Sequence, residues 1–142
     1  MRGGFLHNEV LVRRLRQVAQ ECGAVVHLEA PVRIDGVVNY IDLAIEKGGQ
    51  VTVCEPEQSW RRVDNDVRKA VAFGAQRLLI VTPDSHTAQA CRRQLRRHAP
   101  SGARLQVIAC PLGAALEILR QALNSIPNAP VAPVPPGQVK ET

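Results

Sequence analysis

The chain has 142 residues, of which 45% are hydrophobic and only 3% aromatic, and its formal net charge is +5. This length accommodates one domain with a single, largely aliphatic core, and the scarcity of aromatic residues argues against a protein that stacks many unpaired bases. The positive charge permits a nucleic-acid partner. The four cysteines form no C-x-x-C pair and are expected to be buried free thiols in a reducing compartment. No signal peptide is evident, and no apolar run approaches the roughly 20 residues of a membrane helix. We therefore expect a soluble, cytoplasmic protein with no membrane partner.

The first half of the chain predicts one helix followed by three strands. Apolar residues at spacings of four, three and four predict a helix over residues 6–22, with Gly23 just after its end. Runs rich in β-branched residues then predict strands over residues 24–29, 37–46 and 51–55. Pro31 is expected to interrupt the chain after the first strand, and Asp35-Gly36 is a turn signal. The three strands therefore form an antiparallel meander.

The second half of the chain changes to helices that alternate with buried strands. Ser59 is a candidate N-cap for a helix over 60–73, and Asp84 is a candidate cap for the next helix, over 85–98. Apolar runs predict strands over 77–83 and 104–109, and a leucine stripe predicts a last helix over residues 112–124.

The order of these elements is α-β-β-β-α-β-α-β-α, which predicts an α/β domain with a mixed sheet and helices on both faces. A purely parallel nucleotide-binding sheet is excluded, because the first three strands leave no room for helices between them. The domain is expected to span residues 1–124. Residues 125–142 include five prolines and are predicted to form a disordered, Pro-rich tail that can tether a protein partner.

Three acidic residues are expected to gather at one end of the predicted sheet. The strand period is expected to direct Ile41, Leu43 and Ile45 to one face and Asp42 to the other. Glu55 and Glu57 share a face, and a short turn allows Asp42 and Glu55 to face each other across the ladder. Carboxylates this close repel unless a cation lies between them, and Mg²⁺ or Mn²⁺ suits such oxygen ligands. The alternative is three solvated acids on an exposed sheet face.

The helix-meander-helix-strand order, with Asp42 followed by Glu55-Pro56-Glu57, resembles the PD-(D/E)XK nuclease superfamily over roughly residues 5–82. The resemblance implies a restriction endonuclease-like fold with the core order α-β-β-β-α-β, here followed by α-β-α. It also implies that Asp42 and Glu55 bind the metal, together with the carbonyl oxygen of Pro56. Glu9 on the first helix matches an accessory acid of some branches of the family.

The chain departs from the family pattern at Glu57, where the motif has a lysine. Glu57 can act as a general base or as a ligand of a second metal. The missing cation can instead come from Lys69 on the next helix, where Arg62, Asp66 and Lys69 are expected to share one face. A third interpretation is an inactive relative that has lost the lysine.

Arginines near the predicted site are candidates for contacts with phosphates, without sequence readout. They are Arg61, Arg62, Arg92, Arg93 and Arg96, and Arg97 continues the last group. The alternative is that they are ordinary exposed arginines of helices. Trp60 is expected to lie in the core or to staple the helix rather than to stack on a base.

The first hypothesis is therefore a metal-dependent nuclease that hydrolyses DNA phosphodiester bonds. Its catalytic residues would be Asp42, Glu55, Glu57 and Lys69. Nucleases of this kind often pair to cut both strands, so a homodimer is compatible with the hypothesis. The alternative is a catalytically inactive nuclease-fold module that binds nucleic acid or a protein partner.

Overall fold

The computed structural model describes residues 2–97 and 104–127, and the side chains from residue 8 onward within these ranges. One five-stranded sheet, in the order β1-β2-β3-β4-β5, forms the centre of the domain. Its strands are Val25–Ile34, Val37–Lys47, Gln50–Pro56, Arg77–Thr82 and Gln106–Pro111. The first three strands pair antiparallel, and β3, β4 and β5 pair parallel. The predicted α/β class and the predicted mixed sheet are confirmed.

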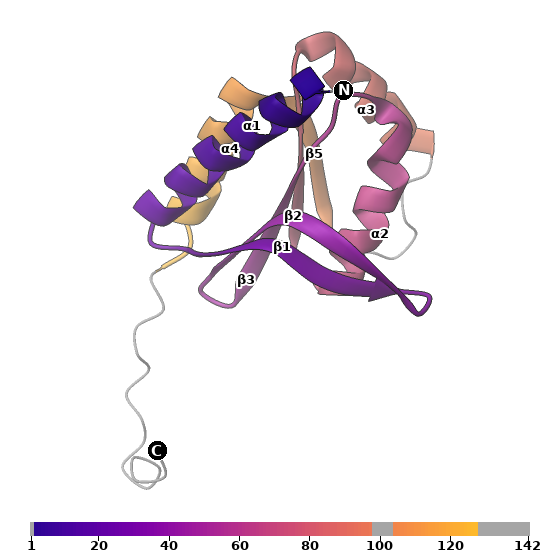
Figure 1. Ribbon diagram of the computed structural model, residues 1–142. Helices are drawn as coiled ribbons and strands as arrows, with labels where there is room; N and C mark the ends of the chain where they lie inside the picture. Colours follow the sequence, from indigo (N-terminus) through magenta and orange to yellow (C-terminus); the bar gives the residue numbers. More distant parts are fainter. Residues whose placement is uncertain (1, 98–103, 128–142) are drawn as a thin grey trace, which may run out of the picture.

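Four α-helices cover the two faces of this sheet (Figure 1). They are α1 (Arg2–Glu21), α2 (Val63–Phe73), α3 (Ser85–Arg97) and α4 (Leu112–Asn124). Helices α1 and α4 lie together on one face, and α2 and α3 lie on the other (Figure 1). The order of elements agrees with the predicted one, apart from a short 3-10 helix, η1 (Trp60–Arg62), which precedes α2.

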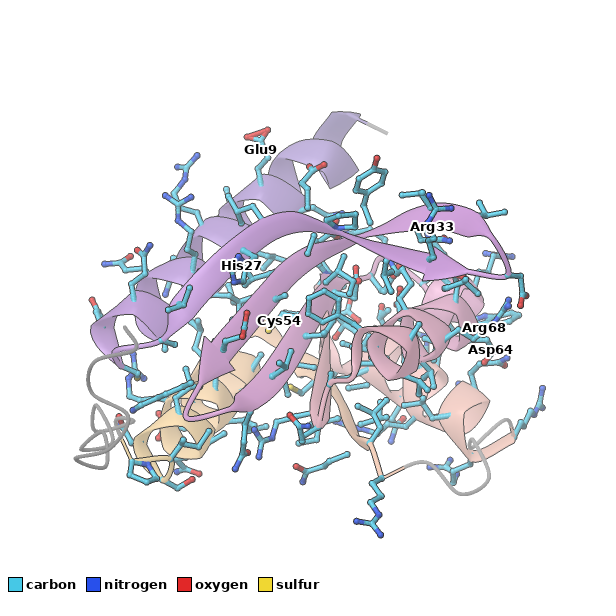
Figure 2. All side chains as sticks on the ribbon, turned by 90° about the horizontal axis from the view of Figure 1, so that it is seen from below. Glu9, His27, Arg33, Cys54, Asp64 and Arg68 are labelled. Atoms are coloured by element: carbon cyan, nitrogen blue, oxygen red, sulfur yellow. The ribbon has the colours of Figure 1, made fainter. Side chains whose placement is uncertain are left out.

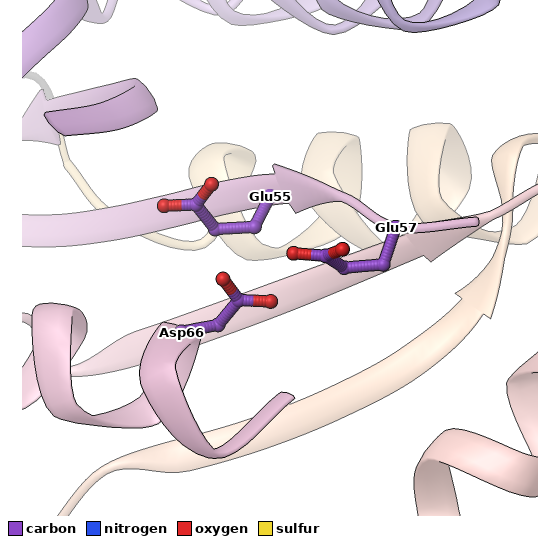
Figure 3. Close-up of side chains that lie close together, drawn as sticks. All are labelled: Glu55, Glu57 and Asp66. Carbon is purple, nitrogen blue, oxygen red and sulfur yellow. The ribbon is translucent and has the colours of Figure 1, made fainter. Parts of the chain in front are cut away.

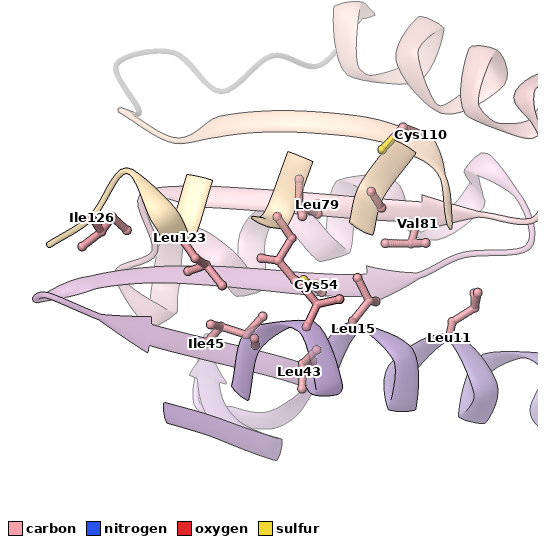
Figure 4. Close-up of a cluster of buried hydrophobic side chains, with 14 residues drawn as sticks. Leu11, Leu15, Leu43, Ile45, Cys54, Leu79, Val81, Cys110, Leu123 and Ile126 are labelled. Carbon is pink, nitrogen blue, oxygen red and sulfur yellow. The ribbon is translucent and has the colours of Figure 1, made fainter. Parts of the chain in front are cut away.

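Two aliphatic layers hold the helices to the sheet. Leu15, Leu43, Leu79 and Leu119 belong to the layer under α1 and α4, part of which is drawn in Figure 4. Val53, Val67, Leu78 and Ile80, with other residues, form the layer under α2 and α3. Strand β4 contributes to both layers because it is buried on both faces, as its continuous apolar run predicts.

Several local predictions are confirmed by hydrogen bonds and backbone angles. Ser59 Oγ accepts a hydrogen bond from the Arg61 N–H at 3.3 Å, so it caps η1. Asp84 Oδ1 accepts from the Thr87 N–H at 2.7 Å, and this bond lowers the pKa of Asp84. Gly23 follows α1 with a left-handed backbone angle, as predicted, and Gly74, for which no such role was predicted, ends α2 in the same way; glycine carries no Cβ penalty there.

Pro31 does not interrupt the chain, contrary to the prediction. It lies within β1 and pairs with Tyr40 of β2, and the strand continues to Ile34. Strand β1 is at the edge of the sheet. A proline is tolerated there because an edge strand needs hydrogen-bond donors on only one side.

The prediction that Ile41, Leu43 and Ile45 share a face is wrong in part. Leu43 and Ile45 pack under α1, whereas Ile41 packs under α2 with Ala30 of β1. The change of face coincides with Glu29, whose φ of 51° is left-handed and which stands opposite Asp42 in the β1–β2 register. This distortion twists the hairpin from one layer to the other at Asp42.

The core continues two residues past the predicted domain boundary, because Ile126 is buried against the α1–α4 layer. Residues 128–142, which make up most of the predicted Pro-rich tail, lie outside the described residues. In the described ranges, none of the helices has the length and apolar character required to cross a membrane.

Candidate metal centre

The candidate site lies where β2 and β3 separate. Their antiparallel pairing ends at Leu43 opposite Cys54, so the next position places Asp42 opposite Glu55. Both acids line one cavity of about 570 Å³. Other residues that line it include Asn8, Tyr40, Pro56, Glu57, Arg62 and Lys69. The predicted juxtaposition of Asp42 and Glu55 is therefore present, and it arises because the strands diverge beyond their last pair.

Lys69 reaches this cavity from α2. Its Nζ donates a hydrogen bond to the Tyr40 carbonyl oxygen at 2.8 Å and lies 3.0 Å from Glu55 Oε2, outside hydrogen-bonding alignment with that oxygen. Both residues are buried, with 4% of Lys69 and 1% of Glu55 exposed. A cation on the helix after β3 thus lies against the acid that the motif resemblance assigns to the metal. Arg62 and Lys69 both line the cavity, and Asp66 Oδ1 lies 3.8 Å from Lys69 Nζ.

A second feature of the site is a cluster of three buried acids. One carboxylate oxygen each from Glu55, Glu57 and Asp66 lies within 4.8 Å of the others, and the three carboxylates converge in Figure 3. Asp66 is fully buried, and neither of its oxygens has a hydrogen-bond donor among the described residues. Because hard divalent cations prefer such all-oxygen sites, Glu55, Glu57 and Asp66 could hold a metal ion.

The electrostatics of the cluster reflect its burial and the nearby Lys69, whose Nζ lies 3.0 Å from Glu55 Oε2 and 3.8 Å from Asp66 Oδ1. Burial raises the pKa of Asp66 to about 11, and the neighbouring Glu57 adds to this shift. Burial also raises the pKa of Glu55 to about 8, although Lys69 lowers it in part. The raised pKa favours the protonated form of Asp66, which can donate a hydrogen bond to Glu57.

Asp66 is the residue of this cluster that the predicted metal ligands did not include. Its signal is present in the sequence, because Val63, Val67 and Ala70 define the buried side of α2 and Asp66 falls on that same side. An acid on the apolar face of a helix needs a partner. Asp42 lines the same cavity but is not one of the three clustered acids.

The structure does not bring Glu9 into the Glu55 cavity. Glu9 is exposed on α1 (Figure 2) and lines a neighbouring hollow of about 410 Å³, which Asp42 and Glu29 also border. Asn8 lines both spaces, and its Oδ1 accepts a hydrogen bond from Gln58 Nε2 at 3.1 Å. The residue of α1 that reaches the site is thus Asn8, one position before the predicted acid.

The predicted phosphate-binding arginines fall into separate groups. Arg62 lines the acidic cavity, whereas Arg61 lies over the Trp60 ring, 5.5 Å from its centroid. On α3, Arg92 donates from Nε to the Ala109 carbonyl oxygen at 3.0 Å and ties the helix to β5. Arg93 instead faces Trp60 across a small pocket, while Arg96 is exposed and does not line that pocket.

Trp60 is not a core residue, contrary to the prediction, because 43% of its surface is exposed. The 3-10 geometry of η1 is the reason. The buried α2 face begins at Val63, and no residue of η1 is buried.

No protein-family model and no curated protein matched the sequence. Among solved structures, the chain is similar to AF1548, described as a protein of unknown function, with 12% identity and a TM-score of 0.49. The match covers 70% of this chain and 57% of that protein's chain, so the present chain spans little more than half of its length.

Proposed function

We propose that the protein is a metal-dependent nuclease with a restriction endonuclease-like fold, and that it hydrolyses DNA phosphodiester bonds with Mg²⁺ or Mn²⁺. One observation carries this proposal. Lys69 Nζ lies 3.0 Å from Glu55 Oε2, in the same cavity as Asp42, Pro56 and Glu57. The cation that the motif lacks at position 57 is thereby available from α2.

The residues of the cavity fit a hard divalent cation. Asp42 and Glu55 offer carboxylates, Pro56 offers a carbonyl oxygen, and Glu57 and Asp66 supply further carboxylates beside them. Mg²⁺ and Mn²⁺ suit such oxygen donors, while the absence of sulfur and imidazole from the lining argues against zinc. When bound, such an ion would polarise the phosphate and lower the pKa of a bound water.

The chain's own residues would bind the phosphate, balance its developing negative charge and accept a proton. The Lys69 ammonium is positioned to balance negative charge that develops on the phosphate as it is attacked. Glu57 can accept a proton from the attacking water, since its carboxylate lies beside that of Glu55. Arg62 at the cavity wall can contact a neighbouring phosphate and orient the strand.

Cleavage assays on purified protein test this proposal. With Mg²⁺ or Mn²⁺, wild type should cut DNA, and Asp42→Asn should lose about 100-fold or more of the rate. Glu46→Gln is the matched control, because Glu46 is an exposed acid on the same strand that pairs with His27 at 2.8 Å. Equal cleavage by wild type and Asp42→Asn would contradict the proposal. DNA binding without cleavage under any metal would instead favour the inactive nuclease-fold module.

A further inference from the structure

Trp60 lies beside a second pocket that the proposed reaction does not use. The pocket has a volume of about 200 Å³ and is lined by Trp60, Ala90, Arg93, Gln94 and Arg97. It lies between η1 and α3, on the face of the sheet opposite α1 and α4. Large exposed aromatic residues next to arginine are typical of recognition surfaces.

The charges around this pocket are suited to an anion. Arg93 and Arg97 are four residues apart, so they project from the same side of α3. Arg61 lies over the Trp60 ring and adds a third guanidinium. None of the residues that line the pocket is acidic. The adjacent acid, Asp64, accepts a hydrogen bond from Gln94 Nε2 at 3.0 Å.

This pocket and the acidic cavity lie on either side of the short segment that contains η1. Ser59 and Arg62 line the acidic cavity, and Trp60, between them in sequence, lines the second pocket. A ligand that occupies both would therefore pass over η1. A polymer with regularly spaced phosphates and flat, apolar rings has the chemistry for such a path.

We infer that Trp60, Arg93 and Arg97 bind single-stranded DNA, with one base stacked on the Trp60 ring and adjacent phosphates held by the two arginines. This inference rests on the proposed function and specifies its substrate as DNA with an unpaired segment next to the scissile bond. In a duplex the bases are already stacked on one another, whereas an unpaired base has a free face for the indole.

Trp60 is the chain's only tryptophan, so its fluorescence reports on this pocket alone. We would titrate the full chain, in EDTA to prevent cleavage, with a single-stranded oligothymidine and with a duplex of equal length. Saturable quenching by the single strand is expected, with clearly weaker quenching by the duplex. Raising the salt concentration from 50 to 200 mM should weaken binding about 7-fold if two phosphates are held.

Variants separate stacking from charge. By anisotropy of a labelled single strand, Trp60→Ala should weaken binding about 5-fold or more. The double variant R93A/R97A should weaken binding and also reduce the slope of log affinity against log salt by about 1.4. Arg14→Ala is the control, because Arg14 is an exposed arginine of α1, on the opposite face of the sheet, and lines neither the pocket nor the acidic cavity.

Equal binding of duplex and single strand, unchanged binding by Trp60→Ala, or an equal loss of binding with Arg14→Ala would each overturn the inference. All these measurements are made without cleavage, so they fail separately from the proposed function. If Asp42→Asn abolishes cleavage while Trp60→Ala binds normally, only the inference is wrong. If the single strand binds at Trp60 but no metal supports cleavage, only the nuclease proposal is wrong.

Discussion

Replacement of Lys69 by methionine tests the central contact of the site. Methionine is similar in length but removes the charge and the hydrogen-bond donor. Two interactions are lost: the hydrogen bond from Nζ to Tyr40 O at 2.8 Å and the ion pair with Glu55 at 3.0 Å. A hydrogen bond that involves a charged group contributes about 1.5–3 kcal/mol, so we expect Lys69→Met to lower the free energy of unfolding by about 2 kcal/mol at pH 6.

The ion-pair contribution depends on pH, because the pKa of Glu55 is raised to about 8. At pH 6 the buried Glu55 is mostly protonated, so little ion pairing is lost. At pH 9 wild-type Glu55 ionises beside Lys69, and the difference of about one unit between pH and pKa corresponds to about 1 kcal/mol of stabilisation. In Lys69→Met the pKa of Glu55 rises further, because Lys69 is the group that lowers it, and this stabilisation disappears. The destabilisation should therefore grow to about 3 kcal/mol at pH 9.

Urea unfolding of the metal-free protein at pH 6 and pH 9 measures this difference. Lys47→Met is the matched control, because Lys47 is also buried and donates to the Leu123 carbonyl oxygen at 2.9 Å. Lys47 forms no ion pair within the part of the chain that the structure describes, so its replacement should cost the same at both pH values. Lys69→Met should also reduce cleavage about 100-fold or more, and Lys47→Met should not. Equal destabilisation by Lys69→Met at pH 6 and pH 9 would refute the reasoning.

Three further predictions concern the acids and the end of the core. In EDTA, the free energy of unfolding should fall as the pH rises from about 5 to 8. The reason is that the raised pKa values of Glu55 and Asp66 leave the folded state with more bound protons than the unfolded state. A free energy of unfolding that does not change over this pH range would contradict the prediction. Millimolar Mn²⁺ should raise the melting temperature of wild type and raise that of Asp66→Asn by clearly less, and an equal rise would exclude Asp66 as a ligand. Gly48→Ala should destabilise the protein more than Gly49→Ala does. Both positions have positive φ, but only a Cβ added at Gly48 would lie 2.5 Å from Ile126 Cγ2. Equal melting temperatures of the two variants would show that Ile126 does not pack there.

Much of the fold follows from local patterns. Apolar periodicity predicts every α-helix of the observed order, though not the 3-10 helix η1, and turn residues such as Asp35-Gly36 predict the hairpins. Pro31 misled the prediction because its effect depends on whether a strand is at an edge of the sheet, and no residue near Pro31 carries that information. Ile41 was assigned to the wrong face because strand alternation assumes regular backbone, whereas Glu29 is left-handed.

The sequence by itself predicted the candidate chemistry, with Asp42, Glu55 and Glu57 at one end of the sheet and Lys69 on the helix that follows. These assignments follow from local sequence patterns, because the strand and helix periods fix which side chains share a face. Only the tertiary structure decided that Asp66 joins Glu55 and Glu57, that Asn8 rather than Glu9 lines the cavity, and that Trp60 is exposed beside α3. Such proximities depend on how the helices pack on the sheet. Because that packing is set by the whole core, no local pattern of residues predicts it.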